Sequence, residues 1–210
     1  QRVDEMQRGR SIVVENDHIV VLGSSPRLPV IVDQLTLANQ QRGGRTIVVL
    51  ADEEPRELAD HVRAVVTDSR GSRLVFRRGD PTRRSDLVLV GAARAREVIV
   101  LAADDEGSDA RAVTATLALG AELGGFDRIP IVVELRDVGG AAGLARACAG
   151  QVHPLVPSQA IARLTAFALG QPGLNRVVEE LIDFHGCDIY VRPLGDMAGA
   201  TFGDTVGRFA

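Results

Sequence analysis

Four carboxylates lie within the six residues of segment 104–109, Asp-Asp-Glu-Gly-Ser-Asp. Clustered acids repel one another unless they are solvated or bridged by a cation, and Ca²⁺ prefers hard oxygen ligands with a glycine that permits a sharp turn. The spacing is not that of an EF-hand loop, so a solvated loop that caps the next helix is the alternative. We expect a candidate Ca²⁺ site at this segment with two further acids: Asp104, Asp105, Glu106 and Asp109, then Asp80 and Glu134.

Segment 23–28, Gly-Ser-Ser-Pro-Arg-Leu, joins a short apolar run to a helical stretch. At this position a dinucleotide-binding fold holds a pyrophosphate against helix N-terminal amides. Ser25 and Leu28, however, replace the second and third glycines of a G-x-G-x-x-G loop. The alternative is a structural turn in which Ser25 caps the helix and Pro26 is its first residue. For an anionic or nucleotide ligand we expect these binding residues: Gly23, Ser24, Ser25, Arg27, Asp52 and Gly79.

Asp52 and Asp80 each follow an apolar run. Asp52 occupies the position where a carboxylate binds an adenine ribose in dinucleotide folds, although with Glu53 and Glu54 it is equally suited to a helix N-terminus. Asp80 is suited to cap the next helix, and Pro81 to that helix's first turn.

Composition excludes several classes of function. A net charge of −4 gives no general attraction to nucleic acid or anionic lipid, so we expect no nucleic-acid partner. The two cysteines and four histidines lack metal-ligand spacing, and no G-x-S-x-G motif is present, so we expect no enzyme. The longest apolar runs are far shorter than the roughly 20 residues of a membrane-spanning helix. The polar start without Met suggests a piece of a longer protein.

The elements that position these residues follow a βαβ pattern. Short β-branched apolar runs alternate with helical stretches, which predicts a doubly wound, parallel, Rossmann-like α/β sheet. We predict strands at 18–22, 46–50, 73–76, 98–101, 131–134 and 152–156. We predict helices at 30–41, 55–66, 85–90, 110–123 and 141–148. Because trailing loops of parallel strands share one edge, the candidate residues should face one crevice.

After Pro157 the pattern changes to two amphipathic helical stretches, 158–168 and 174–184, joined by Gly-Gln-Pro-Gly. Their apolar faces pack either on the chain's own sheet or on a partner subunit. A short terminal strand is predicted at 188–192.

The order of these motifs resembles RCK domains, the regulators of potassium conductance, and within them the CASTOR/POLLUX family of ion channels. The resemblance extends from about residue 15 to about residue 209. It is carried by Gly23, Asp52 and Asp80 at strand ends and by these segments: 15–16, 34–35, 38–39, 79–82, 104–106, 108–112, 131–134, 171–174 and 178–180.

The resemblance implies a cytoplasmic domain of a membrane channel that assembles with its own copies, as dimers, into a tetramer-type gating ring. It implies a linker from a pore helix at 1–14, a Rossmann-like lobe at 15–156, a crossover helix-turn-helix at 157–187 and the start of a C-terminal subdomain at 188–210. The chain looks like a bacterial relative. Because the first loop departs from the glycine-rich pattern, Ca²⁺ is favoured over NAD or another nucleotide.

Two other classes of function stay open. One is a free-standing nucleotide-binding subunit of a potassium transport system. The other is an NAD-dependent oxidoreductase, which would need a catalytic acid or base near the nicotinamide, and the sequence offers none.

Overall fold

A computed structural model describes residues 12–40, 43–171, 173–182, 184, 199–201 and 203. The predicted strand at 188–192 lies outside these residues. So do most of the predicted linker at 1–14 and most of the predicted C-terminal subdomain at 188–210.

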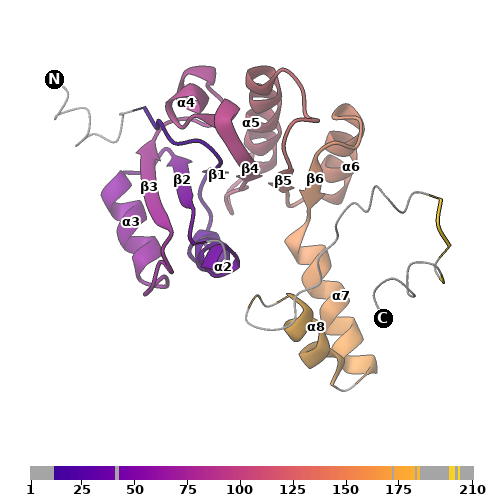
Figure 1. Cartoon of the computed structure of the whole chain (residues 1–210). Coiled ribbons are helices and arrows are strands. Elements are labelled where there is room, and N and C mark those ends of the chain that lie inside the picture. Colours follow the sequence, from indigo (N-terminus) through magenta and orange to yellow (C-terminus); the bar gives the residue numbers. More distant parts are fainter. Residues whose placement is uncertain are drawn as a thin grey trace.

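Six parallel strands form one sheet in the order β3-β2-β1-β4-β5-β6 (Figure 1). They are β1 (His18–Leu22), β2 (Thr46–Ala51), β3 (Arg73–Arg78), β4 (Ala95–Val100), β5 (Ile131–Glu134) and β6 (His153–Leu155). The winding reverses between β1 and β4, so their trailing loops diverge and leave a crevice at the carboxyl edge. The predicted doubly wound, Rossmann-like α/β fold is therefore confirmed.

Strand β1 is apolar along most of its length because both of its faces are buried. Ile19 and Val21 point into one core cluster, and Val20 and Leu22 point into the other. The alternation follows from the two-residue period of a strand.

Helices cover both faces of the sheet. Side chains such as Val32 and Leu58 fill the first core cluster, and side chains such as Leu87, Leu119 and Leu144 fill the second. The helices on the first face are α2 (Leu28–Gln40) and α3 (Pro55–Arg63), and those on the second are α4 (Arg84–Leu89), α5 (Ser108–Leu123) and α6 (Val138–Ala147).

Several element boundaries differ from the prediction by one to three residues, and two of these differences are informative. Helix α2 begins at Leu28, so Pro26 precedes it and the interpretation of Pro26 as its first residue is wrong. Strand β4 begins at Ala95, directly after the 3₁₀ turn η1 (Ala92–Arg94). The prediction placed the start of this strand too late, because strands were recognised as apolar runs and the charged residues Arg96 and Glu97 interrupt that pattern.

Helices α7 (Pro157–Gly170) and α8 (Leu174–Ile182) form an arm that leaves the sheet at the end of β6 (Figure 1). No residue of α7 is buried, and Phe167 and Leu169 are 56% and 88% exposed. Helix α7 is therefore not buried against the chain's own sheet, which was one of the two packing alternatives.

Candidate functional site

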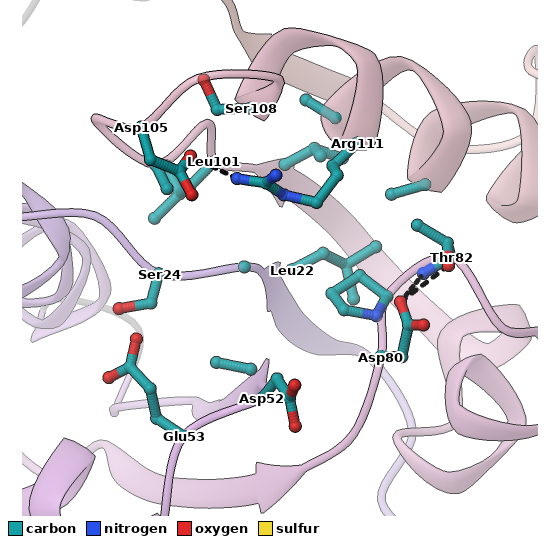
Figure 2. A pocket seen from close by; sticks show the side chains of 17 residues that line it. Leu22, Ser24, Asp52, Glu53, Asp80, Thr82, Leu101, Asp105, Ser108 and Arg111 are labelled. Carbon is teal, nitrogen blue, oxygen red and sulfur yellow. Dashed lines mark hydrogen bonds and ion pairs between the residues drawn. The ribbon is translucent and has the colours of Figure 1, made fainter.

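The loops after β1 to β4 enclose a pocket of about 390 Å³ at the carboxyl edge of the sheet (Figure 2). Strand ends and α5 supply its apolar lining. Its polar lining residues are Ser24, Asp52, Glu53, Asp80, Thr82, Asp105, Ser108 and Arg111. Four carboxylates thus face one guanidinium, which makes the pocket net acidic. The predicted convergence is confirmed for Gly23, Ser24, Asp52, Asp80 and Asp105.

Gly23 directly follows β1 and has a conformation that other residues rarely adopt, with φ +89°. A Cβ at this position would lie 2.7 Å from the carbonyl oxygen of Leu101, which follows β4. The glycine therefore lets the first loop approach the fourth strand, and this close approach shapes the floor of the pocket.

The turn after Gly23 offers few free amide donors. Pro26 and Pro29 have no N–H group, and the N–H groups of Arg27 and Leu28 donate to the Ser25 hydroxyl (3.3 Å) and carbonyl (2.9 Å). A pyrophosphate at a helix N-terminus needs such groups free. The turn therefore does not form the usual diphosphate cradle, and Ser25 serves the turn as its internal acceptor.

Asp80 closes a tight turn over the third strand. Its Oδ1 accepts hydrogen bonds from the Thr82 N–H (2.9 Å) and hydroxyl (2.7 Å), which hold the pKa of Asp80 below its usual value despite partial burial. The N-terminal cap of α4 is Arg83, so the prediction that Asp80 caps this helix is wrong. Gly79 lies beneath the turn and packs on Asp86 rather than lining the pocket.

Asp52 and Glu53 extend from the end of β2 toward the pocket (Figure 2). The Asp52 side chain is 85% exposed and lies 3.6 Å from Arg78 Nε, so it is largely available to a ligand. Glu54 pairs with Arg78 and is the N-cap residue of α3, although its side chain makes no capping hydrogen bond.

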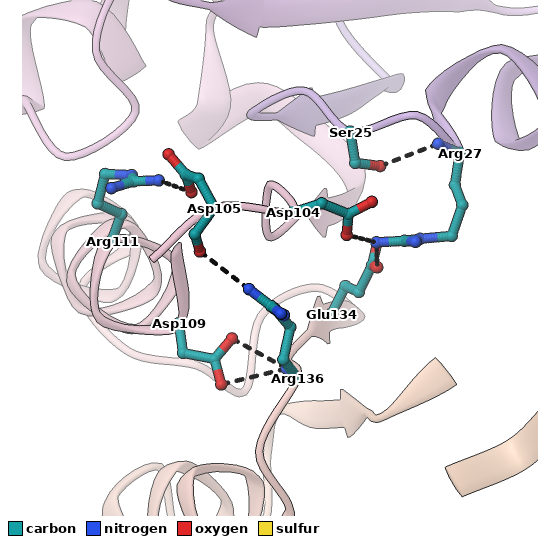
Figure 3. Close-up of polar contacts among 8 residues, drawn as sticks. All are labelled: Ser25, Arg27, Asp104, Asp105, Asp109, Arg111, Glu134 and Arg136. Carbon is teal, nitrogen blue, oxygen red and sulfur yellow. Dashed lines mark hydrogen bonds and ion pairs between the residues drawn. The ribbon is translucent and has the colours of Figure 1, made fainter. Parts of the chain in front are cut away.

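The acidic residues of segment 104–109 point in different directions (Figure 3). Asp104 pairs with Arg27 at 3.0 Å, and Asp105 pairs with Arg111. Asp109 accepts the backbone N–H groups of Arg136 (2.9 Å) and Asp137 (2.9 Å). Glu106 is exposed.

Within the described part of the chain, no three Asp, Glu, His or Cys side chains are grouped so that they could hold a metal. Arginine side chains pair with Asp104 and Asp105, and backbone N–H groups bind Asp109, so these carboxylates have protein partners in place of a cation. The Ca²⁺ site therefore stays a prediction, and binding would require the Asp104 or Asp105 ion pair to open.

Arg27 joins the first, fourth and fifth strands. Its guanidinium pairs with Asp104 and with Glu134, which is only 4% exposed at the end of β5 (Figure 3). Burial raises the pKa of Glu134, and Arg27 partly opposes that rise. Burial alone would lower the pKa of Arg27, but the two carboxylates outweigh it and the net shift is upward.

A second hollow, of about 280 Å³, lies on the other side of this ion-pair group. Arg27, Asp104 and Glu134 line it together with Arg136 and the first turn of α7. The segment Asp104–Asp105 therefore separates the pocket from the base of the arm. Arg136 bridges the two sides, because its Nη1 donates to the Asp105 carbonyl at 3.0 Å.

The sequence did not single out Arg111, Thr82 or Arg136 as site residues. Arg111 lies one helical turn after Gly107, a spacing that returns a side chain to the loop before its helix. That signal was available for Arg111. No sequence signal pointed to Arg136, because its contact with the Asp105 carbonyl depends on the packing of β5 beside β4.

Among the described residues, none of the helices has the length and apolar character of a membrane-spanning segment.

Residues 14–131 match the family described as the calcium-activated potassium channel slowpoke-like RCK domain.

Ion channel CASTOR of Lotus japonicus is 32% identical over 211 residues, which is 100% of this chain and 25% of that protein. Ion channel DMI1 of Medicago truncatula is 32% identical over 212 residues, covering 100% of this chain and 24% of the channel. These matches confirm the resemblance to CASTOR/POLLUX channels. The chain spans about a quarter of the length of these relatives.

Solved structures share the fold at low identity. The TrkA-N domain of inner membrane protein ybaL from Escherichia coli has a TM-score of 0.56 at 18% identity, covering 76% of this chain and 100% of that domain. The human SLO3 gating ring has a TM-score of 0.54 at 13% identity, covering 90% of this chain and 31% of that one. The NAD(P)-binding domain of an exopolyphosphatase-related protein from Archaeoglobus fulgidus has a TM-score of 0.52 at 16% identity, covering 74% of this chain and 98% of that domain.

Proposed function

The chain belongs to the slowpoke-like RCK domain family, and from this premise we propose that it is a ligand-sensing regulatory domain of a cation channel. In this proposal the domain works on the cytosolic side of the membrane and acts by binding rather than by catalysis. The observation that carries the proposal is the acidic pocket at the point where the sheet reverses its winding, the usual ligand position in this architecture.

The pocket wall is connected to the arm. Asp105 lines the pocket, and its carbonyl accepts a hydrogen bond from Arg136, which lines the hollow at the first turn of α7. A ligand that moves the acidic segment therefore also changes the surroundings of the arm. Such a ligand shifts the equilibrium between two arrangements only by its difference in affinity for them.

Ca²⁺ is the first candidate ligand. Four carboxylates line the pocket against one guanidinium, and oxygen-rich acidic sites suit Ca²⁺. The pairs Asp104–Arg27 and Asp105–Arg111 are at least half exposed on their acidic side, so a divalent cation can compete for them. We propose that Ca²⁺ replaces these guanidinium groups, with Asp80, Glu106, Asp109 and Glu134 as secondary candidates.

Calorimetric titration of the purified chain with Ca²⁺ tests this proposal. The double variant Asp104→Asn with Asp105→Asn should lose the binding heat. The matched control, Asp60→Asn with Asp68→Asn, changes two exposed carboxylates outside the pockets and should bind like the wild type. Equal binding by both variants would remove the acidic segment as the site.

A nucleotide such as NAD or ADP is the second candidate ligand, and Asp52 favours it. This carboxylate follows β2, is mostly free, and stands where a ribose hydroxyl pair is bound in Rossmann folds. The scarcity of free amides after Gly23 argues that any phosphates lie near Arg111 rather than on α2. Titration with ADP should give heat that is lost in Asp52→Asn, whereas Glu57→Gln should bind normally.

We propose that copies of the chain assemble through the arm into a homo-oligomeric ring next to a pore domain. The exposed apolar residues of the arm support this, among them Ile161, Leu164, Phe167, Val177 and Leu181. Similarity along the whole chain to one part of a channel favours this role over a free-standing transporter subunit.

A further inference from the structure

Residues 12–17, which precede β1, lie at the end of the sheet opposite the pocket. Val13 is 1% exposed and belongs to the second core cluster. Its N–H donates to the carbonyl of Leu89 at 2.8 Å, and its carbonyl accepts from Arg94 Nη2 at 2.6 Å. We call these contacts of Val13 with Leu89 and Arg94 the N-terminal seat.

The neighbouring contacts divide into two groups by the element that provides them. The ring Nε2 of buried His18 lies 2.8 Å from the Val90 carbonyl at the end of α4. In contrast, the N–H of Asp17 donates to the Arg94 carbonyl of η1 at 3.0 Å. The N–H group of Val13 and the ring of His18 are therefore bound by backbone carbonyls at the end of α4, whereas the N–H group of Asp17 is bound by η1, which also reaches the Val13 carbonyl through the Arg94 side chain.

The other end of α4 is tied to the pocket. Asp86 Oδ2 accepts the N–H of Asp80 at 2.9 Å, and a Cβ on Gly79 would lie 2.9 Å from the same oxygen. Asp80 and Thr82 line the pocket. The loop that a ligand would touch is thus packed directly on the first turn of α4.

Helix α4 is short and held from both sides. Its six residues correspond to about 9 Å of helix, a length over which a helix transmits displacement without bending. Leu87 anchors it in the core with no exposed surface, and Arg84 pairs with Glu122 of α5 at 2.7 Å. Movement of the helix as one piece therefore reaches the carbonyls of Leu89 and Val90.

We infer that α4 couples the pocket to the segment that precedes the sheet. A change in the loop Asp80–Thr82 moves α4 through Asp86, and the N-terminal seat transmits that movement to Val13. That a ligand supplies the change rests on the proposed function, whereas the coupling itself is a property of the fold. The chain ahead of the sheet is then displaced at Val13, whereas the N–H group of Asp17 stays bound to η1.

Amide hydrogen exchange of the whole chain, read by NMR, tests the coupling without a ligand. Asp86→Asn should speed the exchange of the Val13 amide by about tenfold or more, because it loosens the helix that supplies the Leu89 carbonyl, while the Asp17 amide changes less than about threefold. Asp68→Asn, which weakens a similar hydrogen bond to the Arg70 N–H outside this route, should leave both amides unchanged.

Equal acceleration of Val13 and Asp17, or acceleration of neither, would overturn the inference. Should Asp86→Asn fail to fold, Val13→Ala gives the reciprocal test, since coupling works in both directions. It should speed exchange of the Thr82 amide more than that of the Gly23 amide, and equal effects would again overturn the inference. A chain that binds neither Ca²⁺ nor ADP would refute the proposed function while leaving these exchange results intact.

Discussion

The guanidinium of Arg27, at the entrance to α2, forms an ion pair with the buried carboxylate of Glu134 at the end of β5. These residues lie far apart in the sequence, and β4 separates their strands in the sheet. Their contact, shared with Asp104, locks the loops on both sides of the winding reversal into one arrangement. A ligand that competes for Arg27 or Asp104 therefore acts on the fold as well as on the pocket.

Arg27→Gln should lower the free energy of unfolding by about 2 kcal/mol at pH 7, because it leaves Glu134 buried without its counter-ion. The value is below that of a fully buried pair, since the Arg27 side chain is 39% exposed to solvent. Urea unfolding of both proteins measures the difference.

The loss should depend on pH. Because the folded chain raises the pKa of Glu134 above 4.5, folding favours its protonated form, and this contribution to stability is lost as pH rises through the folded pKa. The deficit of Arg27→Gln should therefore be smallest below pH 4.5 and grow above it. The double variant with Glu134→Gln should show no such growth, and a pH-independent deficit in the single variant would contradict the assignment.

Gly23→Ala should destabilise the chain by about 3 kcal/mol, the sum of a positive-φ penalty and a backbone clash with the Leu101 carbonyl. Gly43→Ala is the matched control, because Gly43 also has positive φ but no atom lies within 4 Å of its added Cβ. We expect about 1 kcal/mol for that control. Thermal and urea unfolding compare the two, and equal losses would show that the close approach to Leu101 is unimportant.

Asp109→Ala should release the turn between β5 and α6, because the carboxylate accepts the N–H groups of Arg136 and Asp137. We expect a loss of about 2 kcal/mol and faster hydrogen exchange at both amides. Asp60→Ala, at an exposed helical position, should cost less than about 0.5 kcal/mol. Unchanged exchange at Arg136 would show that the turn holds itself without Asp109.

Phe167→Glu should separate assembled chains without unfolding them. The Phe167 side chain is 56% exposed, so its replacement removes nothing from the core of one chain, whereas a buried charge between two chains is unfavourable. Sedimentation velocity should show a lower oligomeric state with an unchanged unfolding midpoint. Gln159→Glu, on the first turn of α7, serves as the charge-matched control. An identical sedimentation profile for wild type and Phe167→Glu would exclude this face from the interface.

Local sequence patterns determined the sheet and its winding. Short apolar runs such as residues 46–50 predict buried strands. Because these runs alternate with helical stretches, they predict a parallel sheet covered by helices. Convergence of Gly23, Asp52 and Asp80 at one edge followed from that topology alone. The helix pair after Pro157 was also predictable, because two stretches with helical apolar spacing are joined by the segment Gly-Gln-Pro-Gly.

Only the tertiary structure decided which charged groups pair with one another. Segment 104–109 looked like a cation site because its acids are adjacent in sequence, yet adjacent loop residues point in different directions and find partners on other elements. Asp104 meets Arg27 and Asp109 meets the amide of Arg136 only because β4 packs between β1 and β5. Sequence thus determined which groups reach the edge of the sheet, and packing determined which of them neutralise one another, since Coulombic and hydrogen-bond energies depend on distances across strands rather than along the chain.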